Sequence, residues 1–462
     1  MYCCNIFKYK VSLTKVFHRV DIVIYIYIYV YLKEQMDLLQ DVKVVELSTF
    51  VAGPAAGGIL ADFGAEVIRV EQASGDIFRD AYTSLVGVTF KDPYSRSPSF
   101  YVDNRGKKSI VLDLKRQDCL EAFYKLCESA DVFVSNQRAS VLDKLGLNPR
   151  DMHKRFPHLI ICPITAYGLE GGDASRPGYD VGAFWARSSA AWTHTREDDQ
   201  NITSGASAFG DHATGMASVT GILAALHKQR ITGKGDIVKT SLLRTGVYFN
   251  SWGIANNLQP RINKDLGGSG RVPTTPGGAG IRDKAANPLI NVYKGKDQKS
   301  FWLLGYEADR HWPGVKAMMN SVGATYINDE KFNSLRGRMK NNLELIKYMD
   351  TTFQTKNRDE WLKIFDDFQI WFQPVQDTAE VIHDQQIIAN KMLAKIKPSK
   401  DDIKGYETLP SVGPPVGFES SGDDLVFNHV PTVGENTYEV LKSLGYTDEQ
   451  IAKLGNPKGG KL

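Results

Sequence analysis

From residue 42 onward the chain alternates short apolar segments with segments of helical pattern, and this alternation most constrains its fold. The apolar segments, each of strand length, are residues 42–47, 66–71, 109–114, 131–136 and 158–165. Between them, residues 54–64 have Pro54 early and Gly64 at the end, as helices commonly do, and residues 116–130 carry apolar side chains at helical spacing. Near-continuously apolar strands that alternate with helices predict an α/β fold with an open parallel sheet covered on both faces.

The middle of the chain predicts a long helix followed by a break. A helix is expected over residues 211–229, followed by a turn at residues 232–236, a short strand and another helix. Residues 258–287 are rich in Gly and Pro, which is typical of a linker or a lid. The polypeptide is therefore expected to leave the first domain near residue 257.

A smaller α+β domain is expected after this break. Residues 288–306 alternate like a hairpin with its turn at 294–299, and helices are expected over residues 308–320 and 342–368. From about residue 374 the pattern is mixed again and ends in a pair of helices. The expected division is a large domain beginning with residues 36–257, a linker at 258–287, a small domain at 288–373 and a C-terminal return to the large domain at 374–462.

The first 35 residues do not share the globular pattern. Residues 21–32 read DIVIYIYIYVYL, which is too short to span a bilayer, because a membrane helix needs about 20 apolar residues. Basic residues precede this run, as in a signal peptide, but no small-residue cleavage site follows it. We interpret residues 1–35 as a non-globular extension or a mis-assigned start, and we expect the working protein to begin at Met36. Detection of peptides from residues 1–35 in the natural protein would refute this expectation.

Composition excludes several function classes. The net charge is +3 with basic and acidic residues interleaved, which argues against a nucleic-acid partner but suits a polyanionic small molecule. No membrane partner is expected. The cysteines form no CxxC pair, and no His lies at metal-ligand spacing, so we expect buried thiols in a reducing compartment and no metal. This favours the cytoplasm or, alternatively, an organelle matrix. The cysteines are Cys3, Cys4, Cys119, Cys127 and Cys162.

The motif search points to other chemistry. GxGxxG after a strand, GxxxxGK[ST], GxSxG and HExxH are all absent from the sequence. The informative segments are residues 44–76, 176–190, 204–236 and 431–446. Taken by themselves, Asp180 and Asp211 are good residues for a helix start, since the helix dipole favours a carboxylate there, and His212 is typical of a surface. From the residues alone, Asp211 is therefore interpreted as a helix cap.

At these segments the chain resembles the family III CoA-transferases (CaiB/BaiF-like), which include formyl-CoA, carnitine-CoA and 2-hydroxyacyl-CoA transferases. The resemblance runs from about residue 38 to residue 455. The family's catalytic Asp lies in a GDxxxG-like segment that leads into a long helix ending near TGKG. Here GDHATG at 210–215 and TGKG at 232–235 match that pattern. The resemblance therefore implies that Asp211 is a carboxylate nucleophile.

The mechanism that the resemblance implies moves CoA between carboxylic acids. The Asp211 carboxylate attacks the thioester of the acyl-CoA donor, forming a mixed anhydride and releasing CoA thiolate, which then gives an aspartyl-CoA thioester. An acceptor acid reverses these steps. Because both intermediates hydrolyse easily, water must be kept out. CoA is thus a substrate, and no tightly bound cofactor is expected.

The resemblance also assigns contacts. Phe50 and Val51 fall where the family's turn approaches the thioester, and Gly277 and Gly278 lie closest to its glycine loop, as oxyanion donors or a lid. CoA contacts are implied at Gln72, Asn136, Gln137, Lys144 and Leu145. Gln72 cannot pair ionically with a phosphate where the family often has Arg, so Arg69, Arg79 or Arg105 is expected to substitute.

The family also contains alpha-methylacyl-CoA racemases, which add a His about 30 residues before the Asp in a GHD motif. Here the segment is GYD with Tyr179, and a phenol with a usual pKa of about 10 is a poor base at neutral pH. Transfer is favoured, and the alternatives are a racemase, an acyl-CoA hydrolase or a silent CoA-binding protein. The AFWARS segment, residues 183–188, resembles the branch acting on 2-hydroxy acids. Phe184 and Trp185 then line an acyl pocket or belong to the core.

The quaternary expectation also comes from the resemblance. The family fold is a Rossmann-like large domain formed by both chain ends, with a smaller domain inserted between them. Two subunits interlock like chain links, so an interlocked homodimer is expected.

Overall fold

The computed structural model describes residues 37–80, 97–195, 201–203, 205–259, 282, 285, 287–399, 407–419 and 424–455. It divides into two compact units. Unit 1 comprises Met1–Pro177, Ala208–Leu242 and Gln385–Leu462, and unit 2 comprises Gly178–Ser207 and Leu243–Asp384. The domain boundaries drawn from sequence stay a prediction. The two units differ from them because residues 178–207, 243–257 and 374–384 group with the smaller unit. Residues 1–35 and most of 258–287 lie outside the described residues.

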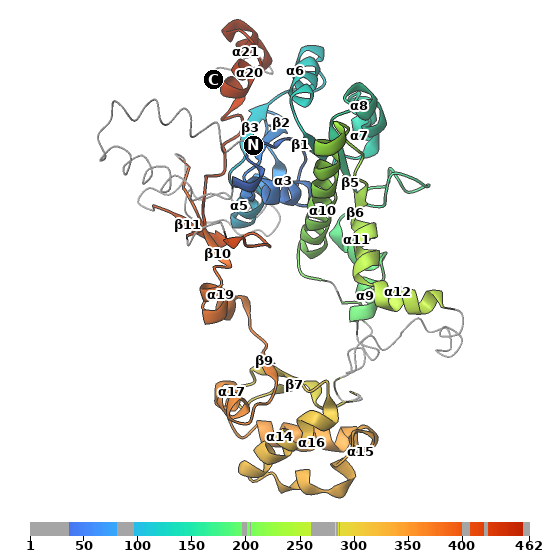
Figure 1. The fold of residues 1–462 in the computed structure, drawn as a ribbon, viewed down its shortest axis with the longest axis vertical. Coiled ribbons are helices and arrows are strands. Elements are labelled where there is room, and N and C mark those ends of the chain that lie inside the picture. Colours follow the sequence, from blue (N-terminus) through green and yellow to red (C-terminus); the bar gives the residue numbers. More distant parts are fainter. Residues whose placement is uncertain are drawn as a thin grey trace. The chain divides into compact units, whose positions relative to one another are not determined.

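Unit 1 is built on a six-stranded sheet in the order β3-β2-β1-β4-β5-β6, with every pair parallel. The predicted parallel sheet is therefore confirmed. From β1 the chain proceeds outward through β2 and β3, then returns to place β4 on the other side of β1. Figure 1 shows β2 and β3 on one side of β1 and β5 and β6 on the other. The strands are β1 Lys43–Leu47, β2 Glu66–Glu71, β3 Lys108–Val111, β4 Val132–Ser135, β5 Ile160–Thr165 and β6 Thr240–Ser241.

Helices cover both faces of this sheet because side chains along each strand alternate in direction. Val44 of β1 packs into a core with α3 (Ala52–Asp62) and α10 (Phe209–Thr232). Val45 packs into the opposite core with α6 (Gln117–Glu128) and the C-terminal helices. Other elements of unit 1 are α5 Pro98–Asn104, α7 Ala139–Lys144, α8 Pro149–Arg155, α19 Gln385–Ala389, α20 Thr437–Ser443, α21 Asp448–Gly455, β10 Leu393–Ile396, β11 Leu409–Val412 and β12 Val426–Phe427.

Unit 2 is an α+β arrangement around the predicted hairpin. Strands β7 (Ile290–Lys294) and β8 (Ser300–Leu304) pair antiparallel, which confirms the hairpin, and β9 (Phe372–Pro374) adds to β8. The remaining helices are α9 Ala190–His194, α11 Leu242–Phe249, α12 Ser251–Leu258, α14 Ala308–Ser321, α15 Leu335–Lys340, α16 Asn342–Phe353, α17 Arg358–Asp367 and α18 Thr378–Val381. None of the helices in the described ranges is long and apolar enough to cross a membrane.

One predicted helix of unit 2 is wrong in its extent. Residues 342–368 form α16 and α17 instead of a single helix. Asn357 and Glu360 make a capping box that starts α17, and this local hydrogen bonding competes with continuation of α16. The prediction failed because the apolar spacing continues across residues 354–357, whereas the helix does not.

Candidate active site

The sheet has a switch point between β1 and β4, where the strand order reverses. Leu47 at the end of β1 is in register with Ser135 at the end of β4. The residues that follow these strands therefore emerge side by side at the carboxyl edge of the sheet. Ligands of open α/β sheets bind at such an edge. Phe50 and Val51 follow β1, and Asn136 and Gln137 follow β4, so the fold brings these predicted contacts together.

Asn136 fastens the turn after β1. Its Oδ1 accepts a hydrogen bond from the backbone N–H of Thr49 at 2.9 Å, and its Nδ2 donates to the carbonyl of Thr49 at 2.6 Å. Both polar atoms of the Asn136 amide thus engage the turn. The side chain positions residues 48–51, while its direct contact with CoA stays a prediction.

The same turn has an unusual backbone and no spare room. Phe50 has a φ of 60°, a left-handed conformation that costs a non-glycine residue of the order of 1–3 kcal/mol. A Cβ at Gly53 would lie only 2.5 Å from the Cβ of Ser48 and 3.1 Å from Cγ of Asn136. A glycine at position 53 is therefore required for the turn to fold back against the strand ends.

Asp211 lies in the first turn of α10, and it is half-buried. Gly215, one helical turn further, packs on α3: a Cβ there would lie 2.9 Å from the Cβ of Ala55 and 3.2 Å from the amide nitrogen of Ala56. Residues four apart share a helix face, so Asp211 belongs to the face of α10 that meets α3. Asp211 is thus carried on α10, which packs against α3. Helix α3 directly follows the turn at residues 48–51, which we call the switch-point turn.

The remaining predicted contacts of unit 1 lie at helix and strand ends. Gln72 is exposed directly after β2, Lys144 is the exposed last residue of α7, and Leu145 follows it half-buried. Arg138 is the exposed N-cap residue of α7, next to Gln137, and it was not among the contacts predicted from the sequence. Its only signal in the sequence is adjacency to Asn136 and Gln137.

The expectation that Arg69, Arg79 or Arg105 replaces the missing phosphate-binding arginine is wrong. Each is less than a tenth exposed and already engaged. Arg79 donates to both oxygens of Glu71 and to the carbonyl of Pro431, and Arg105 forms a two-point ion pair with Asp62. These guanidinium groups pair with buried carboxylates inside unit 1, and a phosphate cannot reach them.

Arg69 belongs to a buried charge cluster beneath the switch-point turn. Its guanidinium bonds to Asp76 and Asn104 and lies 3.6 Å from Glu46 and 3.8 Å from Glu71. It also donates to the carbonyl of Ser48 at 3.2 Å, so the cluster reaches the turn itself. Arg69 therefore has a structural role: it holds β2 to α5 and to the turn.

Lys107 completes this cluster. Its Nζ donates to Glu46 at 2.7 Å and to the carbonyl of Pro54 in α3 at 2.9 Å. Burial lowers the pKa of Lys107, although the negative charge of Glu46 opposes that effect. Glu46 in turn accepts from the hydroxyl of Ser48 at 2.6 Å. Lys107 therefore holds the turn at both ends, through Glu46 in β1 and through Pro54 in α3.

Thiol chemistry is not available in the described part of the chain. Cys119, Cys127 and Cys162 are buried and unpaired with one another. Burial raises the pKa of the Cys162 thiol to about 12, so it does not ionise at neutral pH. Cys3 and Cys4 lie outside the described residues.

Other residues named from the sequence lie in unit 2 or outside the described ranges. Phe184 and Trp185 are 2% and 7% exposed, with ring centroids 5.6 Å apart, as expected for core residues. Asp180 is buried and Tyr179 is 65% exposed. Gly277 and Gly278 lie outside the described residues.

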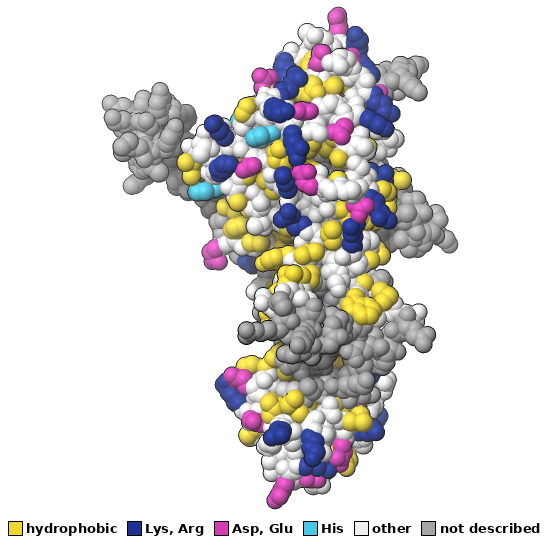
Figure 2. All heavy atoms as spheres, turned by 90° about the vertical axis from the view of Figure 1, so that its right-hand side faces the viewer, with side chains coloured by type: hydrophobic (Ala, Val, Ile, Leu, Met, Phe, Trp, Pro, Cys, Tyr) yellow, Lys and Arg dark blue, Asp and Glu magenta, His cyan; other side chains and the backbone are white. Residues whose placement is uncertain are grey.

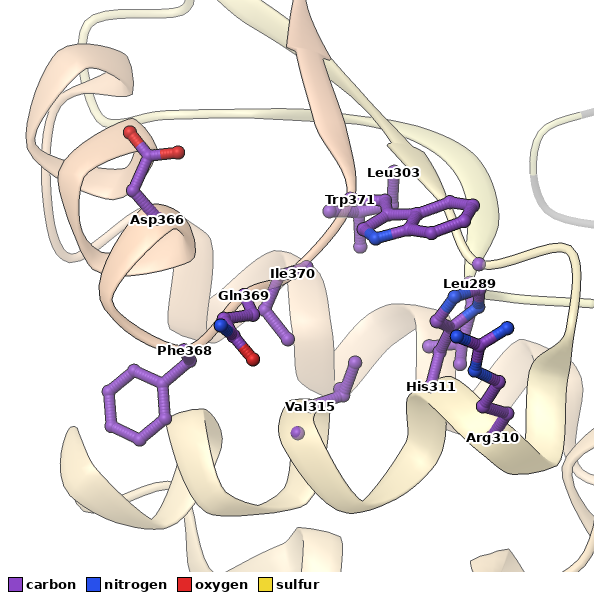
Figure 3. Close-up of a pocket in the computed structure, with 12 residues that line it drawn as sticks. Leu289, Leu303, Arg310, His311, Val315, Asp366, Phe368, Gln369, Ile370 and Trp371 are labelled. Atoms are coloured by element: carbon purple, nitrogen blue, oxygen red, sulfur yellow. The ribbon is translucent and has the colours of Figure 1, made fainter.

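A groove of about 640 Å³ lies within unit 2, between α14 and the segment joining α17 to β9 (Figure 3). His311 and Trp371 form one wall, with ring centroids 4.7 Å apart. The ring nitrogens of His311 are inaccessible, and Arg310 is already paired with Glu307. Among the described residues, none of those predicted to act on CoA lines this groove, and the chemistry is not assigned to it.

The parallel sheet with its switch point between β1 and β4 defines an α/β protein with a Rossmann-like unit. The chain belongs to CoA-transferase family III, whose model matches residues 39–437, and it is an enzyme of the CoA-transferase class that uses CoA thioesters as substrates. The resemblance seen in the sequence is confirmed.

Relatives with known names are similar in sequence or structure to nearly the whole chain. The (R)-2-hydroxy-4-methylpentanoate CoA-transferase of Clostridioides difficile is 32% identical over 427 residues, covering 91% of this chain and 99% of that protein. The cinnamoyl-CoA:phenyllactate CoA-transferase of Clostridium sporogenes is 32% identical over 436 residues, covering 92% and 98%. A solved CAIB/BAIF family structure from Brucella suis has a TM-score of 0.71 at 26% identity, covering 87% of this chain and 98% of that chain.

Proposed function

We propose that this enzyme transfers CoA from an acyl-CoA donor to a carboxylic acid acceptor, with Asp211 as the nucleophile. The observation that carries the proposal is the location of Asp211: half-buried, in the first turn of α10, on the face that packs against α3. Helix α3 begins directly after the switch-point turn, where a bound thioester would lie. Thiols are excluded as nucleophiles among the described residues by burial.

The proposed reaction proceeds through covalent intermediates. A carboxylate oxygen of Asp211 attacks the thioester carbon and the C–S bond breaks. This step releases CoA thiolate and forms a mixed anhydride between Asp211 and the donor acyl group. The thiolate then attacks the aspartyl carbonyl, which releases the donor acid and forms an aspartyl-CoA thioester. The acceptor carboxylate attacks that thioester, and the returning thiolate takes the acceptor acyl group and regenerates Asp211. No net proton is consumed, so no general acid or base is required.

The switch-point turn would supply the electrophilic assistance. Backbone N–H groups at Phe50, Val51 and the start of α3 are proposed to face the developing oxyanion, as a helix N-terminus favours negative charge. Loss of one such donor costs about 3 kcal/mol in other enzymes. Asn136 and the buried cluster hold this turn rigid, and rigidity is what makes such donors effective. Gly277 and Gly278 stay proposed as a second oxyanion element or lid.

CoA itself is proposed to lie along the carboxyl edge of the sheet. Gln72, Asn136, Gln137 and Leu145 would contact it, and Lys144 would pair with a phosphate. Arg138 is exposed two residues after Asn136, and we add it as the cation that compensates for the uncharged Gln72.

The proposed acids are 2-hydroxy acids. This rests on the names of the two relatives at 32% identity, which act on a branched 2-hydroxy acid and on phenyllactate. The racemase alternative is disfavoured, because Tyr179 stands where a racemase carries its His.

A donor-by-acceptor exchange assay tests the function. Acyl-CoA donors are incubated with isotopically labelled 2-hydroxy acids, and labelled acyl-CoA is followed by mass spectrometry. We expect the label to move from the acceptor acid into acyl-CoA as the donor thioester is consumed, without release of free CoA. Free CoA appearing without acceptor would indicate a hydrolase. Deuterium uptake from solvent into a 2-methylacyl-CoA without acceptor would indicate a racemase, and no turnover with any pair would leave a CoA-binding protein.

We also propose a homodimer in a reducing compartment, either the cytoplasm or an organelle matrix. Helices α11 and α12 expose large apolar side chains: Tyr248 at 75%, Trp252 at 77% and Leu258 at 73%. Figure 2 shows hydrophobic side chains exposed on the face of the molecule that carries these helices. Clusters of exposed aromatic residues mark protein interfaces. The buried, unpaired thiols fit a reducing environment.

Sedimentation velocity tests this assembly. We expect a species of twice the chain mass of 51.4 kDa. Trp252→Glu should shift the population toward monomer, because a charge in an apolar interface is poorly solvated, while Tyr438→Glu in unit 1 should not. A wild-type monomer at micromolar concentration would contradict the homodimer.

A further inference from the structure

His212, the residue next to the proposed nucleophile, is tethered to the interior of unit 1. Its ring Nε2 lies 3.0 Å from Oδ1 of Asp103, which is 109 residues away in the sequence. The His212 side chain is 47% exposed, whereas the Asp103 side chain is only 4% exposed. Because a carboxylate only accepts hydrogen bonds, the imidazole N–H donates. An exposed residue of α10 is thereby joined to a buried group of α5.

Asp103 is a rigid anchor for this bond. Helix α5 contacts α3 so closely that a Cβ at Gly58 would lie 2.7 Å from the carbonyl oxygen of Asp103. The next residue, Asn104, bonds to Arg69, accepts from Lys107 at 3.2 Å and donates to the carbonyl of Phe100 at 2.9 Å. Asp103 therefore lies between a backbone contact and the charge cluster that supports the switch-point turn.

The N-cap residue of α10 contributes nothing to its first turn through a side chain. This residue is Ala208, which has a left-handed φ of 62° and makes no side-chain cap bond. A capping side chain at this position is normally worth about 1 kcal/mol. The backbone N–H of His212 does bond to the carbonyl of Ala208 at 2.9 Å. The side-chain bond from His212 to Asp103 fixes the turn from outside the helix.

We propose that Asp103 and His212 are a positioning pair that holds the first turn of α10, and so sets the direction from which the Asp211 carboxylate attacks. The inference rests on the proposed role of Asp211. Neither residue exchanges a proton with substrate in this scheme. Their effect is geometric: a reacting group displaced by about 1 Å can lose about 100-fold in rate.

Kinetics of matched variants test the pair. His212→Ala and Asp103→Ala should each lower kcat by about 10- to 100-fold, with KM for acyl-CoA changed less than about threefold. The double variant should be no slower than the slower single variant, because both remove one bond. His212→Gln and Asp103→Asn keep a donor or an acceptor and should recover most of the rate. His227→Ala, an exposed histidine further along α10, should match the wild type.

Hydrogen exchange supplies a readout that does not depend on activity. Asp103→Ala leaves the sequence of residues 208–216 unchanged, and exchange in a peptide covering them should quicken while peptides from unit 2 stay unaltered. Unchanged exchange there, wild-type kcat in His212→Ala, or additive losses in the double variant would overturn the pair. If Asp211→Ala retains activity, the proposed function fails instead, whatever the exchange data show. If Asp103→Ala does not fold, His212→Ala carries the test alone, since its side chain is half exposed.

Discussion

Asp211→Ala is expected to lower kcat for CoA exchange by about four orders of magnitude or more, with a cooperative thermal transition close to that of the wild type. Loss of a covalent nucleophile removes the reaction path itself, and comparable deletions in other enzymes cost that much. Stability should change by less than about 1 kcal/mol, because a first-turn carboxylate contributes only a fraction of that through the helix dipole. Initial rates and a thermal melt on the same preparation measure both quantities.

A matched control separates the nucleophile from a helix-start carboxylate. Asp151 lies in the first turn of α8 and is exposed, so Asp151→Ala should retain full activity. Hydroxylamine added during turnover should convert Asp211 alone to the hydroxamate, visible by peptide mass. Exchange at wild-type speed by the Asp211→Ala variant would end the proposed mechanism, even if CoA still binds.

Arg69→Met is expected to destabilise unit 1 by about 3–5 kcal/mol. The substitution keeps most of the side-chain volume but removes the cation that lies among Glu46, Glu71 and Asp76, all buried. Deleting one partner of a buried ion pair leaves uncompensated charge, which costs that range in other proteins. Denaturant unfolding followed by far-ultraviolet circular dichroism measures the loss.

The control for this prediction is a surface ion pair. Arg150 pairs with Glu170 at 2.6 Å, and both side chains are about two-thirds exposed, at 65% and 67%. Arg150→Met should change the free energy of unfolding by less than about 1 kcal/mol, since water already solvates both charges. Equal losses for the two variants would show that the cluster around Arg69 is no more sensitive than the surface.

The fold could be predicted from sequence where local pattern and tertiary structure agree. The strands of the parallel sheet are mostly apolar, and burial on both faces can be read directly from β5, Ile160–Thr165. The extent of α10 was predicted to within a few residues, because GDHATG and TGKG bracket it. The break between α16 and α17 was missed, because an Asn-Glu capping box is a hydrogen-bond pattern that apolar spacing does not register.

The location of the candidate residues was predictable where they follow adjacent strands, while their role stays a prediction. Phe50, Val51, Asn136 and Gln137 follow neighbouring strand ends because a parallel sheet aligns its carboxyl ends, and this needs only the strand order. The role of Arg69 was misjudged because its partner Asn104 is 35 residues away and β2 and α5 meet only in the folded chain. The partner of His212 was likewise invisible, with 109 residues between it and Asp103.

The contact between α3 and α10 has a consequence for redesign. At Gly215 the two helices meet with no space for even a methyl group, and Gly53 is similarly enclosed. A larger side chain at Gly215 would therefore push the proposed nucleophile's helix away from α3, and one at Gly53 would displace the turn. Libraries that aim to broaden the range of accepted acids should keep these glycines constant and place their diversity elsewhere.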